Sequence, residues 1–319
     1  MSLVILPVRP LRRVRSACPL VGACILLVAH AASAAGDPFA DVVVSYVAGA
    51  NPAAGYTSPS AALGSPERFT GEGFFPSVVS PFSPPFLPDE IVSIGAGGSL
   101  VVKFDEPVVD DPGNPFGIDL LVFGNSGFID GAYPKGFVDG IYGNGGGVIE
   151  VSQDGEHWTP VVGAVADGLF PTLGWLDAGP FDDLPGRIPS DFTKPVDPAL
   201  ALRDLLGLDY PSLVALYDGS GGGAGINLAG TGLSWIAYVR ISVPADAVLH
   251  VEIDAFAAVA STTPASAADL NHDGVVDGAD LGLLLAGWGP ADPSSGADLD
   301  GSGTVDGADL GLLLAAWGD

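Results

Sequence analysis

The last fifty residues contain one pattern written twice, and this duplication constrains the fold of the chain more than any other feature. The first copy starts at Asp269 and reads DLNHDGVVDGADLGLLLAGWG, and the second starts at Asp298 and reads DLDGSGTVDGADLGLLLAAWG. The two starts lie 29 positions apart (269 to 298), and the run VDGADLGLLLA is identical in both copies. Each copy therefore predicts a polar loop followed by an apolar helix, repeated as a unit.

The spacing of oxygen-bearing residues in each loop predicts a calcium site. A twelve-residue loop can surround a hard cation with side chains at positions 1, 3, 5, 9 and 12, a backbone carbonyl at position 7 and a glycine at position 6. Gly274 and Gly303 occupy position 6. The predicted ligands are Asp269, Asn271, Asp273, Val275 (carbonyl), Asp277 and Asp280 in the first loop, and Asp298, Asp300, Ser302, Thr304 (carbonyl), Asp306 and Asp309 in the second.

An Asp- and Gly-rich string can also form ordinary turns, and a single copy would leave that alternative open. Two copies in the same register favour metal binding instead, so we expect two Ca²⁺ sites. Ser302 places a neutral hydroxyl where the first loop has the carboxylate of Asp273. We therefore expect the second site to bind calcium less tightly.

The segment after each loop has the periodicity of an amphipathic helix. Apolar residues fall at i, i+3, i+4 and i+7, which places them on one helical face. We expect the two faces to pack against each other as a small core, in preference to forming a groove for a partner. The residues are Leu281, Leu284, Leu285 and Trp288 in the first copy, and Leu310, Leu313, Leu314 and Trp317 in the second.

Residues 269–317 resemble a type I dockerin, the duplicated loop-helix module that docks onto a cohesin domain. The likeness rests on Asp at position 12, the absence of a helix entering the loop and the two copies joined by a short linker. The sequence departs from the family at positions 10 and 11, which are Gly278-Ala279 and Gly307-Ala308, and in lacking basic residues on the helices. The resemblance implies an all-α module with two calcium sites and a cohesin-like or cell-envelope protein as its partner.

The net charge of the C-terminal segment also favours metal binding. From residue 265 onward there are ten acidic residues and no Lys or Arg, so we expect the metal-free module to be largely unfolded and metal binding to drive its folding. The formal charge of the whole chain is −27, which argues against binding to nucleic acid.

The first 34 residues have the pattern of a secretory signal peptide. Arg9, Arg12, Arg13 and Arg15 precede an apolar stretch, and Ala32-Ser33-Ala34 supplies small residues for cleavage. A membrane anchor, disfavoured because the stretch is short and contains Pro19, and a lipoprotein signal ending at Cys24 remain alternatives. Both cysteines lie in this segment, which excludes disulfides and thiol chemistry from the mature chain. We expect a secreted or surface-held protein with no transmembrane anchor after cleavage.

Residues 37–260 predict one mainly β domain, followed by a linker at 261–268 and the module at 269–319. Alternation of apolar and polar residues is clearest at 248–256, and Asp154-Gly155 predicts a hairpin turn. A short helix is expected at 198–206. The other predicted strands are 42–47, 100–104, 118–123, 148–152, 158–162 and 236–243.

Parts of this domain resemble a discoidin, or coagulation factor C-type, domain. The matching runs are GSLVVKFDEPV from Gly98, VIEVSQDGEHWTPVVG from Val148, AYVRISV from Ala237 and VEIDAFAAV from Val251. The resemblance implies a galactose-binding-like jelly-roll β-sandwich. The likeness covers framework strands and about half of the domain, so it supports an inference about fold more than one about function.

No catalytic residue stands out in the domain. Neither G-x-S-x-G nor H-E-x-x-H occurs, and His157 and His250 are expected to be structural or solvated. Asp110-Asp111 and Asn114 could hold an ion but are more typical of a turn. Four aromatic residues in Gly-rich segments could contact a glycan, although packing under loops is the favoured interpretation. They are Tyr133, Phe137, Tyr142 and Trp175.

The sequence thus predicts a secreted calcium-binding protein, a jelly-roll β-sandwich followed by a small all-α dockerin-like module. The sandwich is expected to be carbohydrate-binding or surface-structural and not enzymatic. Two alternatives stay open, a polysaccharide-degrading hydrolase of the glycosidase type that carries a dockerin, and a purely structural surface-layer protein.

Overall fold

A computed structural model gives the structure of the chain. The predicted leader, residues 1–34, and the linker up to residue 267 lie outside the residues that the structure describes. The described residues are 37–143, 146–259, 268, 270, 276, 278–291 and 296–317.

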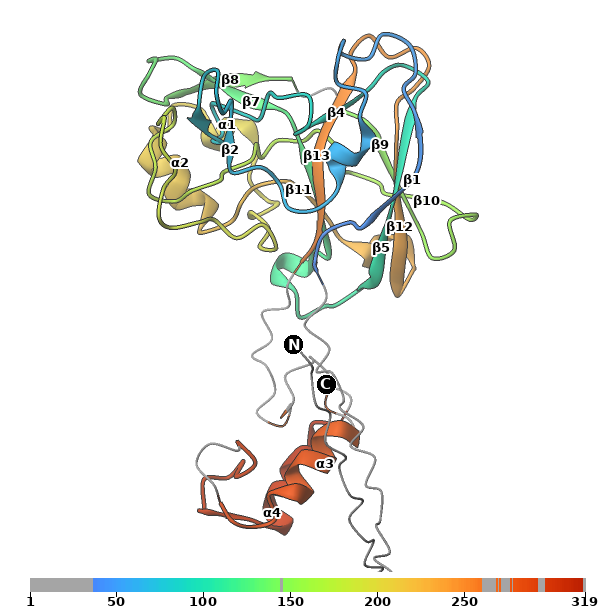
Figure 1. Cartoon of the computed structure of the whole chain (residues 1–319), viewed down its shortest axis with the longest axis vertical. Helices are drawn as coiled ribbons and strands as arrows, with labels where there is room; N and C mark the ends of the chain where they lie inside the picture. The colour runs from blue at the N-terminus through green and yellow to red at the C-terminus, as the bar shows by residue number, and fades with distance from the viewer. Residues whose placement is uncertain are drawn as a thin grey trace, which may run out of the picture. The chain divides into compact units, whose positions relative to one another are not determined.

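The first part of the chain is mainly β, as predicted, and contains two larger antiparallel sheets (Figure 1). One sheet has five strands in the order β1-β5-β12-β9-β10. Val239 in β12 lies opposite Val102 of β5 on one side and Val151 of β9 on the other, which makes β12 a central strand. The strands are β1 Val42–Val47, β5 Ser99–Val109, β12 Trp235–Ser242, β9 Val148–Ser152 and β10 Thr159–Pro160.

The other sheet has four strands in the order β11-β6-β13-β4. The register of β13 against β6 shifts between Ile253 and Ala255, so Asp254 sits at an irregularity in the ladder. The strands are β11 Ala224–Ile226, β6 Leu120–Gly124, β13 Val251–Ala258 and β4 Val92–Ile94.

Apolar side chains from both sheets form one shared core, an arrangement consistent with a β-sandwich. Val102 and Ile241 of the five-stranded sheet belong to the same buried cluster as Val122, Ile253 and Phe256 of the four-stranded sheet. All five side chains are fully buried. Burial of each such side chain contributes roughly 1.5–3 kcal/mol, so this core is the main source of stability for the domain.

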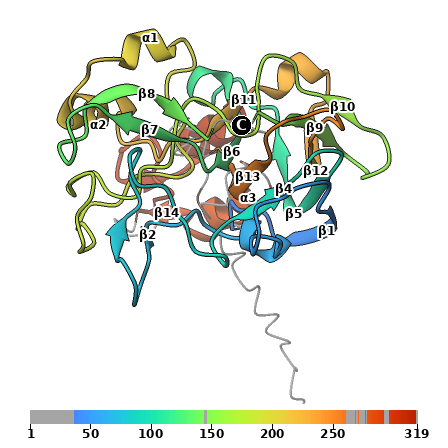
Figure 2. The same cartoon turned by 90° about the horizontal axis from the view of Figure 1, so that it is seen from above.

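A second lobe packs beside the four-stranded sheet and has its own core. In both views β7, β8, α1 and α2 lie together, away from the five-stranded sheet (Figures 1 and 2). Its buried residues include Phe82, Phe128, Leu213 and Tyr217. The elements of this region are β2 Phe69–Thr70, β3 Ser77–Val78, β7 Gly127–Asp130, β8 Val138–Tyr142, α1 Leu202–Leu205 and α2 Tyr210–Tyr217; short 3₁₀ turns span Pro59–Ala62, Pro115–Gly117 and Leu228–Thr231.

The C-terminal part contains two helices of identical sequence, α3 Gly278–Ala286 and α4 Gly307–Ala315. Two short strands, β14 Gly289–Pro290 and β15 Thr304–Val305, pair between them. The shared core consists of residues in pairs 29 positions apart, which indicates that the two copies pack as near-equivalent halves. These pairs are Ala268 with Ala297, Val276 with Val305, and Leu284 with Leu313.

Several expectations need correction. The predicted helix at 198–206 is only the single turn α1, and the predicted strand at 158–162 is only β10. The helical stripes are not buried throughout, because Leu284 and Leu313 are fully buried while Leu285, Trp288, Leu314 and Trp317 are about half exposed. Each nine-residue helix turns only a narrow face toward its partner, so residues at the edge of the stripe stay in contact with solvent.

Candidate metal centre

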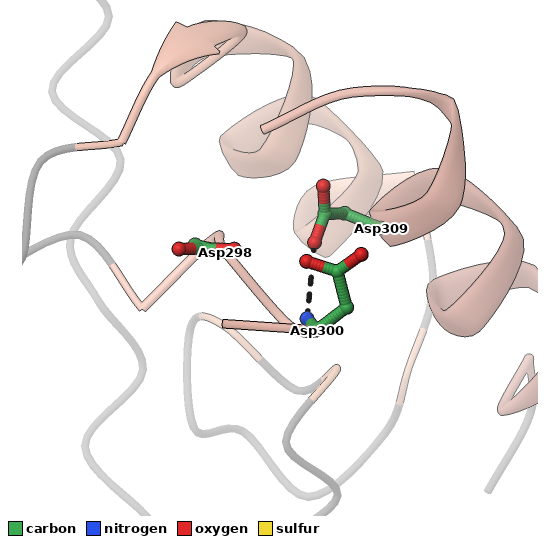
Figure 3. Close-up of side chains that lie close together, drawn as sticks. All are labelled: Asp298, Asp300 and Asp309. Carbon is green, nitrogen blue, oxygen red and sulfur yellow. Dashed lines mark hydrogen bonds between the residues drawn. The ribbon is translucent and has the colours of Figure 1, made fainter. Parts of the chain in front are cut away.

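The second loop brings three carboxylates together in front of α4. One oxygen each from Asp298, Asp300 and Asp309 lies within 4.8 Å of the other two. Figure 3 shows the Asp300 and Asp309 carboxylates facing each other, with Asp298 on the loop segment just before Asp300. Asp309 is fully buried, whereas Asp300 is exposed. Three carboxylates at this separation repel one another in the absence of a cation, so the cluster favours a positive ligand.

Asp309, at position 12, connects the two ends of the loop. Its Oδ1 accepts hydrogen bonds from the amides of Leu299 (2.8 Å) and Asp300 (3.2 Å), and its Oδ2 accepts one from Asp306 (2.8 Å). The Asp306 amide, with those of Asp300 and Leu299, lowers the pKa of the Asp309 carboxyl, although desolvation acts in the opposite direction. The carboxylate is therefore held charged at the first turn of α4, where the helix dipole also favours an anion.

Backbone amides hold the other carboxylates of the loop. Ser302 donates its amide to Asp298 Oδ1 (3.0 Å) and Asp300 Oδ1 (2.9 Å), and Gly303 donates to Asp298 Oδ2 (2.8 Å). Gly303 has a φ of 86°, a left-handed conformation that favours glycine and allows the chain to turn at position 6. The loop thus aims its carboxylates inward through contacts made by its own backbone.

The remaining predicted ligands of this loop have local roles in the structure. Asp306 caps α4 by accepting a hydrogen bond from the amide of Ala308 (2.8 Å). The Ser302 hydroxyl donates to the Thr304 carbonyl (3.2 Å), and Thr304 lies in β15. The donor set of the loop consists only of carboxylate, hydroxyl and carbonyl oxygens, which suits Ca²⁺ better than a softer metal.

Of the first loop, the structure describes only the position-12 residue among the six predicted ligands. Asp280 is fully buried, and its Oδ1 accepts a 2.8 Å hydrogen bond from the amide of Leu270. This is the same contact that Asp309 makes with Leu299 in the second loop. The other five predicted ligands, Asp269, Asn271, Asp273, Val275 and Asp277, lie outside the described residues.

The β domain holds a buried acidic group that sequence reasoning missed. Asp254 is 2% exposed, and its carboxylate accepts long contacts, 3.3 and 3.4 Å, from the amide of Glu67. Desolvation, followed by the charge of Glu67, raises its pKa well above the ordinary value. Burial, with the charge of Glu90 next, raises the pKa of Glu67 to about 7. Glu90 itself is 6% exposed and accepts hydrogen bonds from Thr70 Oγ1 and the amides of Phe86 and Leu87.

Asp254 belongs to the polar set of the alternating strand predicted at 248–256, yet the structure buries it. Glu67 covers Asp254, since its amide contacts the Asp254 carboxylate, and the charge of Glu90 acts on that carboxyl as well. A hydrophobicity pattern reports which residues of a strand share a face, but not whether a second layer covers that face. The one sequence feature that could have indicated the burial of Asp254 is its position in a strand rich in small apolar residues.

Two other candidates are structural. Asp119 is buried and accepts hydrogen bonds from the Asp111 amide and from Asn114 Nδ2, both at 3.0 Å, so the segment 110–114 forms a turn around it. His157 is exposed and its Nδ1 lies 2.8 Å from Asp154 Oδ2 in the hairpin turn. Neither arrangement brings together the groups that a catalytic centre needs.

The chain matches no protein-family model and no curated protein. Within the described residues, no helix has both the length and the apolar character that crossing a membrane requires.

Proposed function

We propose that this is a secreted calcium-binding protein whose C-terminal module binds two Ca²⁺ ions and anchors the β domain to a cohesin-like or cell-envelope protein. One observation carries the calcium half of this proposal. Asp298, Asp300 and Asp309 converge within 4.8 Å in a loop whose spacing is repeated 29 residues earlier in the chain. Dockerin-like architecture is part of the proposal, and the pairing of the two identical helices supports it.

Each predicted ligand would have its own role in binding calcium. Asp298, Asp300 and Asp309 would supply carboxylate oxygens, and the Thr304 carbonyl would supply the backbone ligand. Asp280 would close the first site as Asp309 closes the second, because both are buried and make the same amide contact. Calcium would offset the repulsion between the carboxylates, and its binding energy would then contribute directly to the stability of the module.

We further propose that the β domain is a galactose-binding-like jelly roll that binds glycan without cleaving it. Aromatic side chains on its loops support this part, since sugar rings stack on exposed aromatic faces. Tyr133 is 75% exposed, and Phe137 in the same connecting segment is 39% exposed. Tyr133 was expected to be packed beneath a loop, and its exposure corrects that expectation.

Calcium titration of the full chain by calorimetry, after removal of metal with a chelator, tests the proposal. We expect two binding events accompanied by a gain of helical circular dichroism. Asp280→Ala and Asp309→Ala should each remove one event, whereas Asp246→Ala, at an exposed position of the β domain, should leave both. Absence of any calcium binding by the unmodified chain would overturn the proposed function of the module.

A further inference from the structure

The lobe beside the four-stranded sheet carries an open hollow, formed by a loop that also places Phe181 against the exposed ring of Tyr133. The hollow has a volume of about 310 Å³ and is formed by the loop at residues 177–187. Phe181 belongs to that loop, and its ring centroid lies 5.1 Å from that of Tyr133. Residues lining the hollow include Asp177, Asp182, Asp183, Leu184, Pro185 and Arg187.

Tyr133 belongs to a loop whose backbone is held by hydrogen bonds to the carboxylate of Asp130. Asp130 Oδ1 accepts hydrogen bonds from the amides of Ala132 (2.8 Å) and Phe137 (2.9 Å), and Asp130 Oδ2 accepts one from Gly136 (2.9 Å). Phe181 supports the Tyr133 ring from one side and in turn lies 6.4 Å from the buried ring of Phe82. The exposed part of the Tyr133 ring is therefore a supported surface, which lowers the entropy cost of stacking a ligand on it.

The loop that forms the hollow is also fixed from within. Asp177 Oδ1 accepts the amides of Arg187 and Ile188, both at 2.8 Å, and Asp182 Oδ2 accepts the amide of Gly179 at 2.7 Å. These contacts engage Asp177 and Asp182 in holding the loop. The side chain of Arg187 is 94% exposed, with its Nε 3.7 Å from Asp177 Oδ2, and Asp183 is exposed as well. The loop therefore presents a hydrogen-bond donor and an acceptor to solvent.

From this arrangement we infer that the glycan site of the protein lies here, on Tyr133, Phe181 and the 177–187 loop, and not at the end loops of the sandwich. This inference rests on the proposed glycan binding and assigns its location and ligand class. A pyranose ring would stack on Tyr133, its hydroxyls would donate to Asp183, and Arg187 would donate to its ring or hydroxyl oxygens. Three aspartates against one arginine disfavour an acidic sugar, so the ligand is a neutral glycan.

Retention of the full chain on insoluble cellulose, mannan and chitin, with polygalacturonate beads as the acidic probe, tests the location. We expect retention on at least one of the first three and none on polygalacturonate. Tyr133→Ala should reduce retention at least about tenfold, since exposed aromatic platforms dominate such contacts. Arg187→Ala should reduce it severalfold, and we expect the variant to stay folded because the Arg187 side chain is 94% exposed.

Phe74→Ala is the matched control, because Phe74 is as exposed as Tyr133 but lies at the tip of the β2–β3 turn. Unchanged retention of Phe74→Ala together with loss in the other two variants is the expected result. Retention that survives both Tyr133→Ala and Arg187→Ala, or that is lost in Phe74→Ala instead, overturns the location but leaves glycan binding standing. Retention of the unmodified chain only on polygalacturonate overturns the ligand class, and retention on no probe removes the glycan half of the proposed function.

Discussion

Asp280 and Asp309 are the same residue of two copies, fully buried at the first turn of their helices, and each accepts a 2.8 Å hydrogen bond from the amide ten positions earlier. The carboxylate therefore ties the start of its loop to the start of its helix. A ligand that binds within the loop acts on both segments at once, which is why metal binding and helix packing are expected to be one event.

Ser302→Asp should tighten the second calcium site. The substitution places a carboxylate at position 5, where the Ser302 hydroxyl now only donates to the Thr304 carbonyl. We expect about a threefold to tenfold gain in affinity at this site, because ligand charge tunes calcium loops. Titration calorimetry of both proteins measures it, with Ser302→Ala as the control that should weaken the site or leave it unchanged. Equal affinity for the Asp and Ala variants would exclude a role for position 5.

Leu284→Ala and Leu313→Ala should each destabilise the calcium-loaded module by about 2–5 kcal/mol, the usual cost of emptying a buried leucine position. Both side chains are fully buried in the shared core, whereas Leu283 on the same helix is 46% exposed. Leu283→Ala is therefore the matched control, with an expected change below about 0.5 kcal/mol. Thermal melts followed by circular dichroism at saturating calcium report the difference. Similar melts for all three variants would contradict the packing described above.

Asp254→Asn should stabilise the β domain at neutral pH by about 1–3 kcal/mol, since it replaces a buried carboxyl that has no cationic partner among the described residues. The folded state raises the pKa of Asp254 and of Glu67, so it binds more protons than the unfolded state. Stability is therefore greatest at acidic pH and falls as pH rises, for Glu67 between 4.5 and about 7. The acidic groups that face the pair are Glu72, Asp89 and Glu90.

Thermal melts of the unmodified protein and Asp254→Asn at about pH 5 and about pH 8 measure this linkage. The gain from the substitution should be larger at the higher pH. A gain that is larger at the lower pH, or a loss of stability at both, would show that the Asp254 carboxyl is stabilised as an anion.

Arg240→Gln should destabilise the five-stranded sheet by about 1–3 kcal/mol, because it leaves Glu150 without its charged partner. Arg240 donates to both oxygens of Glu150, at 2.7 and 2.5 Å, and its guanidinium lies 4.3 Å from the centroid of Trp158. Arg203→Gln is the control, since the Arg203 side chain is 78% exposed and its contact with Asp204 is long, at 3.7 Å. Urea unfolding curves of the two variants compare them directly. A cost for Arg203→Gln as large as that for Arg240→Gln would point to general charge loss and not to this contact.

Local sequence patterns were sufficient for strands rich in β-branched residues and for helices with an apolar stripe. The predicted strand at 42–47 is β1, the strand at 148–152 is β9, and both C-terminal helices follow the apolar stripes. The helix α2 was missed because apolar residues run through it with no polar face, although Asp209 as its N-cap and Pro211 in its first turn were available signals.

The lobe could not be predicted for a different reason. Its core joins Phe82, Phe128 and Tyr217, which are far apart in the chain and belong to three unrelated segments. No short window of sequence contains residues from all three segments. The burial of Asp254 and the exposed ring of Tyr133 could therefore not be predicted either. The convergence of Asp298, Asp300 and Asp309 was predictable because all three lie within one twelve-residue loop.

The core of the C-terminal module has a consequence for how the two copies can change over time. Leu284 and Leu313 belong to the same buried cluster, so a change in the size of either side chain alters the packing around the other. Because the two copies share one core, we expect neither to fold alone, so that selection on one acts on both. The letter-for-letter identity of α3 and α4 is what such mutual constraint would preserve after a tandem duplication.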